Sequence, residues 1–211
     1  MRHCGKTYHE FMLASPRDQK VRARFREIVF RTMPPRGIIL DFGAGTGIDA
    51  REYAEKGFRV LVHEPSQENL AYLTEHCSNE IRQGLVAITD MSDVEGVEMI
   101  AANFAVLNLI GDPGALFAKF AGLLAPRGFV LVSLLNPFFL GDARYAWWRS
   151  NLRRLIATGA YAIDGEFDRI HRFAPSFVRR AARPGFALVR CVPDRAGLAL
   201  SQYVFMLFQK Q

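Results

Sequence analysis

Short apolar runs alternate with polar, helix-like stretches along most of this chain. The runs fall at residues 38–41, 58–64, 84–90, 97–104 and 129–135, and helical patterns occupy residues 49–56, 67–77 and 113–124 between them. Buried strands of parallel sheets have this continuous apolar character, and strands that alternate with helices build parallel sheets through crossover connections. The pattern therefore predicts an α/β fold.

The end of the chain departs from this alternation. Residues 185–192 and 201–208 are both strand-like, and the connection between them starts with Pro193 and Asp194. No helix fits into so short a connection, so the two strands should run antiparallel. We predict a parallel sheet that closes with a C-terminal antiparallel strand.

Two segments lie outside the regular alternation. Residues 16–31 have an apolar stripe at Val21, Phe25, Ile28 and Val29, which predicts an amphipathic N-terminal helix. Residues 137–172 lie between the fifth predicted strand and the last helix, and they contain both tryptophans. At 211 residues the chain suits a single domain. We divide it into an N-terminal helical segment (1–36), a core (37–136), an insertion (137–172), and a last helix with the closing hairpin (173–211).

An acid and three alternating glycines follow the first predicted strand, in the order Asp41, Phe42, Gly43, Ala44, Gly45, Thr46, Gly47. Glycines at such a place let the backbone turn sharply and bring N–H groups close to a ligand. The dinucleotide motif G-x-G-x-x-G requires its third glycine three positions after the second. That position is Ile48 here, so the loop disfavours a pyrophosphate ligand.

Glu64 ends the second predicted strand, about 20 residues after the loop, where nucleoside-binding folds place the acid that accepts hydrogen bonds from ribose hydroxyls. Both NAD and S-adenosylmethionine (SAM) carry such a ribose. The alternative for Glu64 is a solvated acid that starts a loop.

Taken in order, the segments 41–47, 64–65, 89–91, 103–108 and 123–128 resemble the successive motifs of class I SAM-dependent methyltransferases of the small-molecule type. The last resembles the family's L-x-P-G-G turn, with Arg127 in place of a glycine. The resemblance covers roughly residues 37–135 and, more weakly, 174–209. It implies a Rossmann-like, doubly wound, seven-stranded sheet with the C-terminal antiparallel strand predicted above.

The resemblance also implies the cofactor, SAM, which leaves as S-adenosyl-L-homocysteine, and a role for each matching residue. Asp41 would orient the loop or receive the amino group, and Gly43, Ala44 and Gly45 would line the methionine and ribose. Glu64 would hold the ribose, while Pro65, Asp90 and Met91 would contact adenine. Asn103 and Phe104 would flank the sulfonium. The alternatives are a turn cap for Asp90 and a satisfied strand-end amide for Asn103.

Charge divides the chain into three parts. The net charge is +6 overall, and it is +6 over residues 1–36, −7 over residues 37–136 and +7 over residues 137–211. Basic flanks could attract anionic substrates, a membrane surface or nucleic acid. The excess of 22 Arg over 5 Lys could equally reflect genome composition. A peripheral membrane contact stays open, nucleic acid is disfavoured but open, and either a monomer or a homodimer is compatible with the sequence.

Cysteine usage and the apolar runs favour a cytoplasmic protein. Cys4, Cys77 and Cys191 are scattered without a CxxC pair, so neither a disulfide framework nor a zinc site is supported, and no clustered ligand pattern indicates another metal. The longest apolar run, residues 129–140, is interrupted and too short to span a bilayer.

The resemblance also makes residues 1–36 a helical lid, residues 37–136 a SAM-binding core and residues 137–172 a substrate cap, and candidates for acceptor binding and catalysis come from the lid and the cap. Tyr8, Phe11 and Arg17 are candidates for a lid over the pocket, and Phe138, Trp147 and Trp148 are candidates for substrate contacts. His171 is the leading candidate for a general base, in a predicted turn before the last helix, and Tyr145 is the second. Each has a structural alternative: a helix covering the sheet edge, the cap's own small core, or a histidine without catalytic function.

The leading functional hypothesis is methyl transfer to a small molecule that is hydrophobic, aromatic or acidic, at an oxygen, nitrogen or carbon atom. An NAD(P)-dependent reductase is the second hypothesis, weakened by Ile48 and by the lack of a Tyr-x-x-x-Lys pair. A SAM-binding or RNA-binding module, including an RNA methyltransferase, is the third. Amino-methyltransferases that act on adenine carry the motif N/D-P-P-Y/F at the end of the fourth strand. The tetrapeptide that starts at Asn136 follows the fifth strand and lacks the second proline, so adenine methylation is disfavoured.

Overall fold

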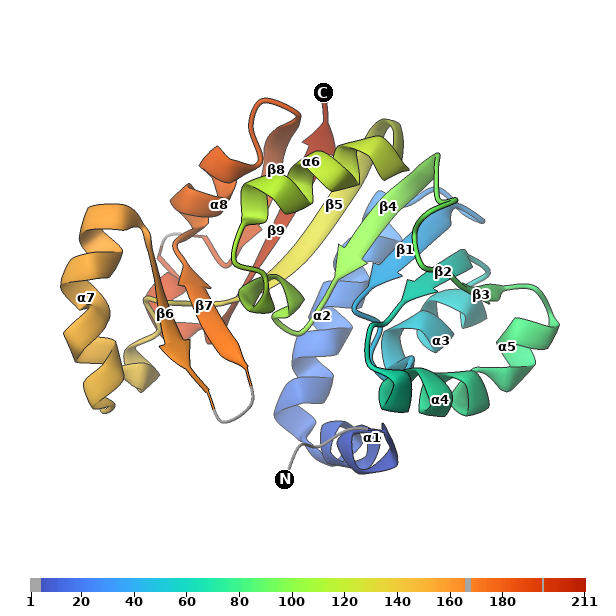
Figure 1. Cartoon of the computed structure of the whole chain (residues 1–211), viewed down its shortest axis with the longest axis horizontal. Coiled ribbons are helices and arrows are strands. Elements are labelled where there is room, and N and C mark those ends of the chain that lie inside the picture. The colour runs from blue at the N-terminus through green and yellow to red at the C-terminus, as the bar shows by residue number, and fades with distance from the viewer. Residues whose placement is uncertain (1–4, 166–167, 195) are drawn as a thin grey trace. The chain divides into compact units, whose positions relative to one another are not determined.

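A computed structural model describes residues 5–165, 168–194 and 196–211. The strands are β1 (Ile38–Phe42), β2 (Arg59–His63), β3 (Val86–Ile88), β4 (Val97–Ala102), β5 (Leu124–Leu135), β6 (Ala160–Asp164), β7 (Arg169–Phe173), β8 (Phe186–Val192) and β9 (Tyr203–Lys210). The α-helices are α1 (Gly5–Ala14), α2 (Pro16–Thr32), α3 (Ile48–Glu55), α4 (Gln67–His76), α5 (Ser78–Arg82), α6 (Pro113–Leu123), α7 (Ala146–Thr158) and α8 (Pro175–Ala181). Short 3₁₀ helices are η1 (Val106–Leu109), η2 (Leu140–Asp142) and η3 (Leu198–Leu200). Figure 1 shows these elements along the chain.

The strands form a seven-stranded sheet in the order β3-β2-β1-β4-β5-β9-β8, and β6 pairs with β7 in a separate two-stranded sheet. β1 is parallel to both β2 and β4, and β2 is parallel to β3. β9 is antiparallel to both β5 and β8. The predicted α/β fold and its C-terminal antiparallel strand are confirmed. The short β8–β9 connection, which contains only the single turn η3 among its described residues, explains the reversal.

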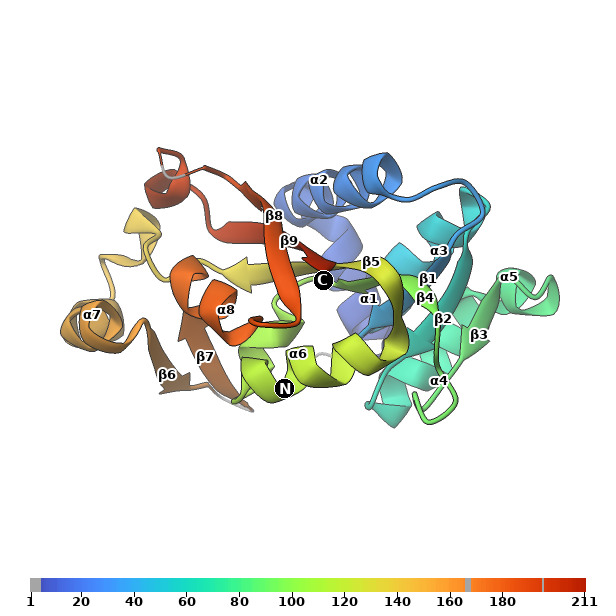
Figure 2. The same ribbon diagram turned by 90° about the horizontal axis from the view of Figure 1, so that it is seen from above.

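The chain divides into two compact units, residues 1–103 with 123–128 and residues 104–122 with 129–211. In the first unit, β1 is central between β2 and β4, and its Ile39 and Leu40 are fully buried. Helices α2 and α3 lie on one side of these strands (Figure 2), where Phe25 and Tyr53 have no exposed surface. Ser15 caps α2 by accepting the N–H of Asp18, so the predicted N-terminal helix is confirmed.

The second unit has an aromatic core. Phe117 of α6 lies edge-on to Phe120, to Phe186 of β8 and to Phe208 of β9, with ring centroids 5.0 to 6.2 Å apart. Helices α6 and α8 lie on the same side of β5 and β9 (Figure 2). Edge-to-face geometry adds to the large apolar area that each ring buries. This core holds the antiparallel strands together.

The cap contains a helix, as predicted, and a hairpin that was not predicted. α7 carries both tryptophans, and β6 and β7 form an antiparallel pair that packs beside it. The prediction of a turn around His171 is wrong, because His171 lies in β7 opposite Ala162. Residues 169–173 alternate only weakly between polar and apolar, and cross-strand pairing decides their conformation.

Other differences concern the boundaries of elements. The N-terminal segment forms a separate helix, α1, before α2. β5 begins at Leu124 and includes the predicted turn at Pro126, where Arg127 takes the left-handed φ of 62° at the position that the family's motif gives to glycine. None of the helices in the described part of the chain is long and apolar enough to cross a membrane.

Gly47, which precedes α3, tests how tightly the first unit is packed. Its φ is 79°, and an added Cβ would lie 2.8 Å from Cys77 Sγ and 2.9 Å from Leu73 Cγ. Gly57 has a similar φ of 86° with nothing within 4 Å. Gly57→Ala should therefore cost only the left-handed strain, about 1–2 kcal/mol, while Gly47→Ala should cost about 1–3 kcal/mol more through overpacking.

Chemical denaturation of both variants measures this difference, since the change in unfolded-chain entropy is common to both. Equal destabilisation of the two variants would contradict close packing of α4 against the glycine loop.

Candidate active site

The glycine loop is a tight turn attached to the end of β2. Gly43, Gly45 and Gly47 all have left-handed φ angles, of 75°, 57° and 79°. The N–H groups of Gly43 and Ala44 both donate to the carbonyl of His63, at 2.8 and 3.1 Å. Residues with a Cβ are strained at such angles, which explains why glycine recurs at alternate positions. The loop brings its backbone to the carboxyl edge of the parallel strands, where α/β sheets bind ligands.

Glu64 closes this turn. One carboxylate oxygen accepts the Gly45 N–H at 2.7 Å, and the other accepts the Ser66 N–H at 2.9 Å. A carboxylate oxygen has a second lone pair, so both can accept a further hydrogen bond from a ligand hydroxyl. Sequence analysis placed Glu64 beside the loop, and the structure brings the two together.

Asp41 is a buried carboxyl beneath the loop. It is 3% exposed at the end of β1, and its Oδ2 has no hydrogen-bond partner among the described residues. Burial raises the pKa of Asp41 well above its usual value, the nearby Asp49 carboxylate raises it further, and Arg22 opposes the shift. A buried acceptor without a donor is costly. An ammonium group bound beside the loop would supply that donor and favour the ionised carboxylate.

Asp49, in the first turn of α3, joins three elements. Its carboxylate accepts hydrogen bonds from Arg22 of α2 at 2.5 Å, from Asn103 after β4 at 2.9 Å, and from Arg26 of α2 at 3.3 Å. Arg22 and Asp49 are 6% and 4% exposed. The amide nitrogen of Asn103, a predicted cofactor residue, is thus oriented by this carboxylate.

Helix α1 covers the glycine loop through two consecutive residues. A Cβ on Gly45 would lie 3.6 Å from the Tyr8 ring, and His9 Nδ1 lies 3.1 Å from Thr46 Oγ1. The His9 ring also contacts His76 and Tyr72 of α4, at centroid distances of 4.5 and 4.9 Å. Burial lowers the pKa of His9, which keeps the ring neutral. Of the predicted lid residues, Tyr8 faces the loop, whereas the side chains of Phe11 and Arg17 are exposed.

The residues predicted to contact adenine lie after β2 and β3. Pro65 is exposed. Asp90 accepts hydrogen bonds from the N–H and the hydroxyl of Ser92, which lower its pKa. The N–H of Met91, at a φ of 74°, donates to Thr89 Oγ1 at 2.9 Å. These contacts build the turn itself, and they bring Asp90 and Met91 together at the end of the third strand.

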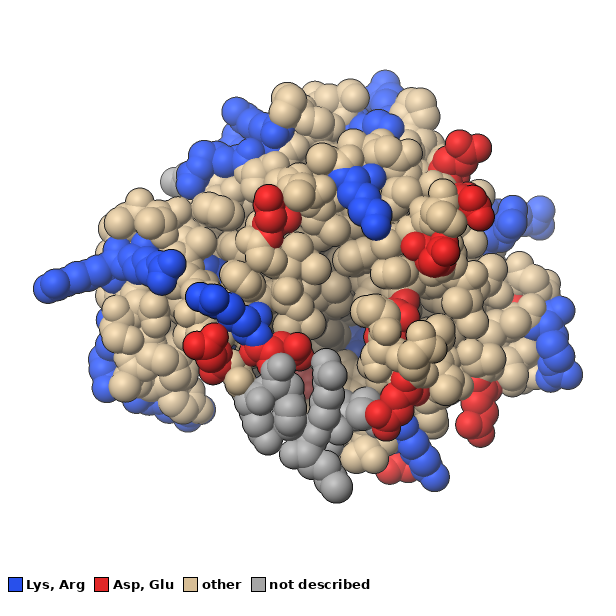
Figure 3. Space-filling model, viewed as in Figure 1, with Lys and Arg blue, Asp and Glu red and all other residues tan. Residues whose placement is uncertain are grey.

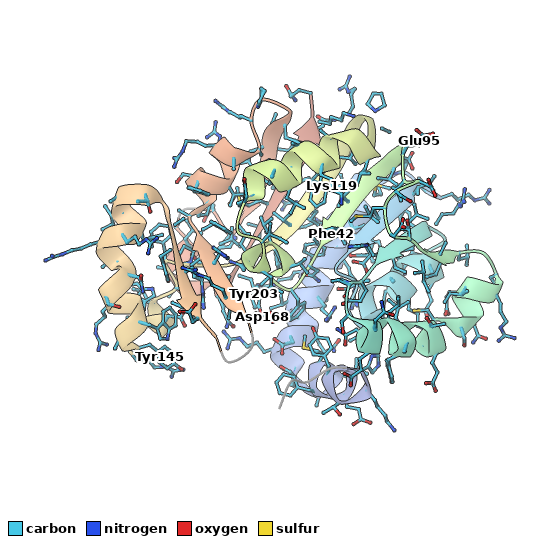
Figure 4. The ribbon with its side chains drawn as sticks, in the orientation of Figure 1. Phe42, Glu95, Lys119, Tyr145, Asp168 and Tyr203 are labelled. Atoms are coloured by element: carbon cyan, nitrogen blue, oxygen red, sulfur yellow. The ribbon has the colours of Figure 1, made fainter. Side chains whose placement is uncertain are left out.

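In the second unit, the segment after β4 is strained. Phe104 and Ala105 have consecutive left-handed φ angles of 51° and 62°. The buried hydroxyl of Ser133 accepts the Ala105 N–H at 3.1 Å, and the Phe104 ring lies 5.7 Å from the ring of Tyr203, which is labelled in Figure 4 at the start of β9. Such strain persists only where surrounding contacts impose it, and it concentrates at functional sites.

His171 lies close to this segment within the same unit. Asn108 of η1 is fully buried, donates to the His171 carbonyl at 2.5 Å and accepts the Leu135 N–H at 2.9 Å. The imidazole stacks on Phe173 at 5.7 Å, and its Nε2 would lie 3.6 Å from a Cβ on Gly111. Asn108 therefore holds β7 beside η1 and the end of β5.

The aromatic candidates of the cap have distinct surroundings. Phe138 and Trp147 pack against the buried cluster of Leu155, Tyr161 and Ala174, and Trp148 Nε1 donates to the Pro137 carbonyl at 2.8 Å. Tyr145 stacks on Trp147 at 5.7 Å, and its hydroxyl accepts from Arg144. Trp147 and His171 lie on opposite faces of the β6–β7 pair. Trp147 of α7 packs on the face that carries Tyr161, whereas His171, which is opposite Ala162 in the register, lies on the other face.

Several residues at these sites escaped sequence analysis, namely His9, Thr46, Arg22, Asp49, Asn108 and Arg172. Each acts through a partner at least 27 residues away in the chain, so no local motif marks it. Among the residues that the structure describes, no three His, Cys, Asp or Glu side chains are close enough to hold a metal ion. Figure 3 shows Lys and Arg side chains projecting over α7, while Asp and Glu gather over β3 and β4.

Comparison with known proteins identifies the family. The family model described as "Methyltransferase domain" matches residues 13–159. The ubiquinone biosynthesis O-methyltransferase of Caulobacter sp. (strain K31) is 29% identical over 122 residues, which are 54% of this chain and 47% of that protein. The chain thus spans about half the length of this relative.

Solved structures share the fold. The S-adenosylmethionine dependent methyltransferase from Mesorhizobium loti has a TM-score of 0.64 and 17% identity, over 89% of this chain and 96% of that one. The glycopeptide N-methyltransferase MtfA, complexed with SAM, has a TM-score of 0.65 and 19% identity, over 90% of this chain and 94% of that one. Because the family match extends over more than half of the 211 residues, the chain belongs to the methyltransferase-domain family, with the fold of SAM-dependent methyltransferases.

Proposed function

We propose that this protein transfers a methyl group from SAM to a small-molecule acceptor. The observation that carries the proposal is the Glu64 carboxylate bound to the Gly45 N–H beside the orphaned Asp41. The hydroxyls of a ribose can donate hydrogen bonds to the Glu64 carboxylate, and the ammonium of an amino acid can pair with the Asp41 carboxylate. SAM carries both groups on one molecule, and NAD carries no such ammonium. Bound SAM would supply an electrophilic methyl group, because its sulfonium makes the departing thioether a good leaving group.

The remaining cofactor contacts follow the same assignment. The backbone of Gly43, Ala44 and Gly45 lines the methionine and ribose, with Tyr8 above it. Pro65, Asp90 and Met91 receive the adenine, and Asn103 and Phe104 flank the sulfonium. Side chains at the glycine positions would block this close approach, so the glycines support a ligand seated against the backbone of the loop.

The acceptor is proposed to be a small molecule. The relative from Caulobacter is named for O-methylation in ubiquinone biosynthesis, and MtfA for N-methylation of a glycopeptide. The cap supports this class, since an α7 and β6–β7 insertion with several aromatic side chains suits a compact organic acceptor. Contacts with a membrane surface or nucleic acid, and the oligomeric state, stay predictions.

We assign the general base to His171. An oxygen or nitrogen acceptor must lose a proton as its bond to the methyl carbon forms. The imidazole can take that proton; its ring stacks on Phe173, and Asn108 holds the His171 backbone through the carbonyl. Tyr145 is the alternative base.

S-adenosylhomocysteine should raise the melting temperature of the protein, whereas NADH should not. Glu64→Gln should weaken S-adenosylhomocysteine binding roughly 10- to 100-fold, because hydrogen bonds to a charged group are lost. Glu75 is an exposed residue of α4, and Glu75→Gln removes the same charge, so this variant is the matched control. Calorimetric titration measures the dissociation constants, and stabilisation by NADH alone would refute the proposed function.

Binding of S-adenosylhomocysteine should strengthen as the pH rises. Because its pKa is raised, the Asp41 carboxyl of the unliganded protein keeps its proton at pH values above the usual carboxyl range. A neighbouring ammonium favours the ionised form, so binding releases this proton and affinity increases with pH through the raised pKa. Asp41→Asn should bind more weakly and lose this slope. Titrations of both proteins from about pH 5 to 8 test it, and parallel pH profiles would remove Asp41 from the ammonium site.

His171→Asn should lower kcat at least about 100-fold with an unchanged dissociation constant for S-adenosylhomocysteine. Labelled methyl transfer from SAM into fractionated cell metabolites identifies the acceptor for this assay. Tyr145→Phe keeps the ring and removes only the hydroxyl, so it is the matched comparison. A large loss in Tyr145→Phe and none in His171→Asn would transfer the base assignment to Tyr145.

A further inference from the structure

The interior of the cap contains an ion pair where a small hydrophobic core is expected. Arg172 of β7 and Asp142 of η2 are 7% and 9% exposed, and Arg172 Nη1 lies 3.4 Å from Asp142 Oδ2. Tyr161, directly opposite Arg172 in the β6–β7 register, is 3% exposed. Burying two charges and a phenol is unfavourable unless each polar atom is satisfied.

These polar atoms are not all satisfied. Arg172 Nε and the Tyr161 hydroxyl are both buried and have no hydrogen-bond partner among the described residues. Burial raises the pKa of the Tyr161 hydroxyl, so it remains an O–H donor. Two unused donors on facing residues of one strand pair therefore lack an acceptor. Buried groups left in this state in a native structure require an explanation.

The contact with Asp142 does not use the full capacity of the guanidinium. An arginine can bind a carboxylate through two parallel N–H···O bonds, and this pair has a single long one. A ligand carboxylate with two oxygens could engage Arg172 more completely. Asp142 lies in η2, a single turn of 3₁₀ helix that begins with the exposed Leu140.

An aromatic stack leads from the surface to this arginine. Tyr145 is 41% exposed at the start of α7, where Figure 4 labels it, and its ring is nearly parallel to that of Trp147. The guanidinium of Arg172 lies 5.2 Å from the Trp147 ring centroid. An aromatic ligand with a negatively charged end would gain stacking from these rings and an ion pair with the cation.

We propose that Arg172 and Tyr161 bind the carboxylate of a small aromatic acid inside the cap, with Asp142 pairing with the guanidinium until the acid displaces it. This binding site lies on the face of the β6–β7 pair opposite His171, so the acid is a ligand of the cap and is distinct from the acceptor that loses its proton to that imidazole. Trp147 stacks on the aromatic ring of the acid. The structural alternative is an internal ion pair whose unused donors bind buried water.

The isosteric probes 4-hydroxybenzoate and 4-hydroxybenzamide test the proposal, because they differ only in the carboxylate. Titration of the full chain should show the acid binding at least about tenfold more tightly than the amide. Tyr161→Phe should weaken binding of the acid about tenfold and leave binding of the amide unchanged. An internal ion pair with buried water predicts neither effect.

Asp142→Asn should change the affinity for the acid in the opposite direction from Tyr161→Phe. Loss of the internal competitor should tighten binding of the acid, and the acid should raise the melting temperature of this variant more than that of the wild type. A variant that binds the acid more weakly, or equal affinity of the wild type for acid and amide, overturns the proposal. The stability of Tyr161→Phe, which removes only an unbonded hydroxyl, should not fall.

The binding of S-adenosylhomocysteine, measured on the same samples, separates the two proposals. Binding of S-adenosylhomocysteine without discrimination between acid and amide overturns the carboxylate site alone. Discrimination between the probes without nucleoside binding overturns the proposed function and leaves Arg172 as a carboxylate site.

Discussion

The buried carboxylate of Asp49 is the contact on which the first unit depends. It receives hydrogen bonds from α2 and from the end of β4, while its own helix, α3, starts directly after the glycine loop. Leaving either charge of the Arg22–Asp49 pair without its partner costs on the order of 3–5 kcal/mol. Burial raises the pKa of Asp41, and the same pair modifies this shift, since Asp49 raises the pKa further and Arg22 lowers it. Stability and the proposed ligand site therefore share one network.

The second unit depends on buried side-chain amides that hydrogen-bond the backbone of neighbouring segments. Asn108 satisfies both ends of its amide with backbone groups of β5 and β7 and so fixes the cap strands beside η1. Asn136 does the same with Leu198, Ser201 and Phe138. Against this background of satisfied amides, the unbonded donors of Arg172 and Tyr161 are exceptional within the part of the second unit that the structure describes.

Much of the fold could be predicted because its signals are local. Short apolar runs such as residues 38–40, bounded by turn residues, indicate buried strands. The cap of Ser15 marks the start of α2, and the short β8–β9 connection forces an antiparallel pair. The glycine loop and Glu64 were also recognised from spacing alone. The hairpin of β6 and β7 was missed because His171 and Arg172 break its alternation, and α1 was missed because its helical pattern is short.

The sequence by itself determined the class of fold and indicated the part of the candidate site made by backbone and strand ends, because glycine spacing and apolar periodicity act over a few residues. The family followed from the resemblance of successive motifs and from the family match. Only the tertiary structure decided which side chains meet. His9 reaches Thr46, Arg22 reaches Asp49, and Arg172 faces Tyr161 through contacts that chain folding creates. Burial then gives these groups their chemistry, since removal of water raises the pKa of the Asp41 carboxyl and of the Tyr161 phenol.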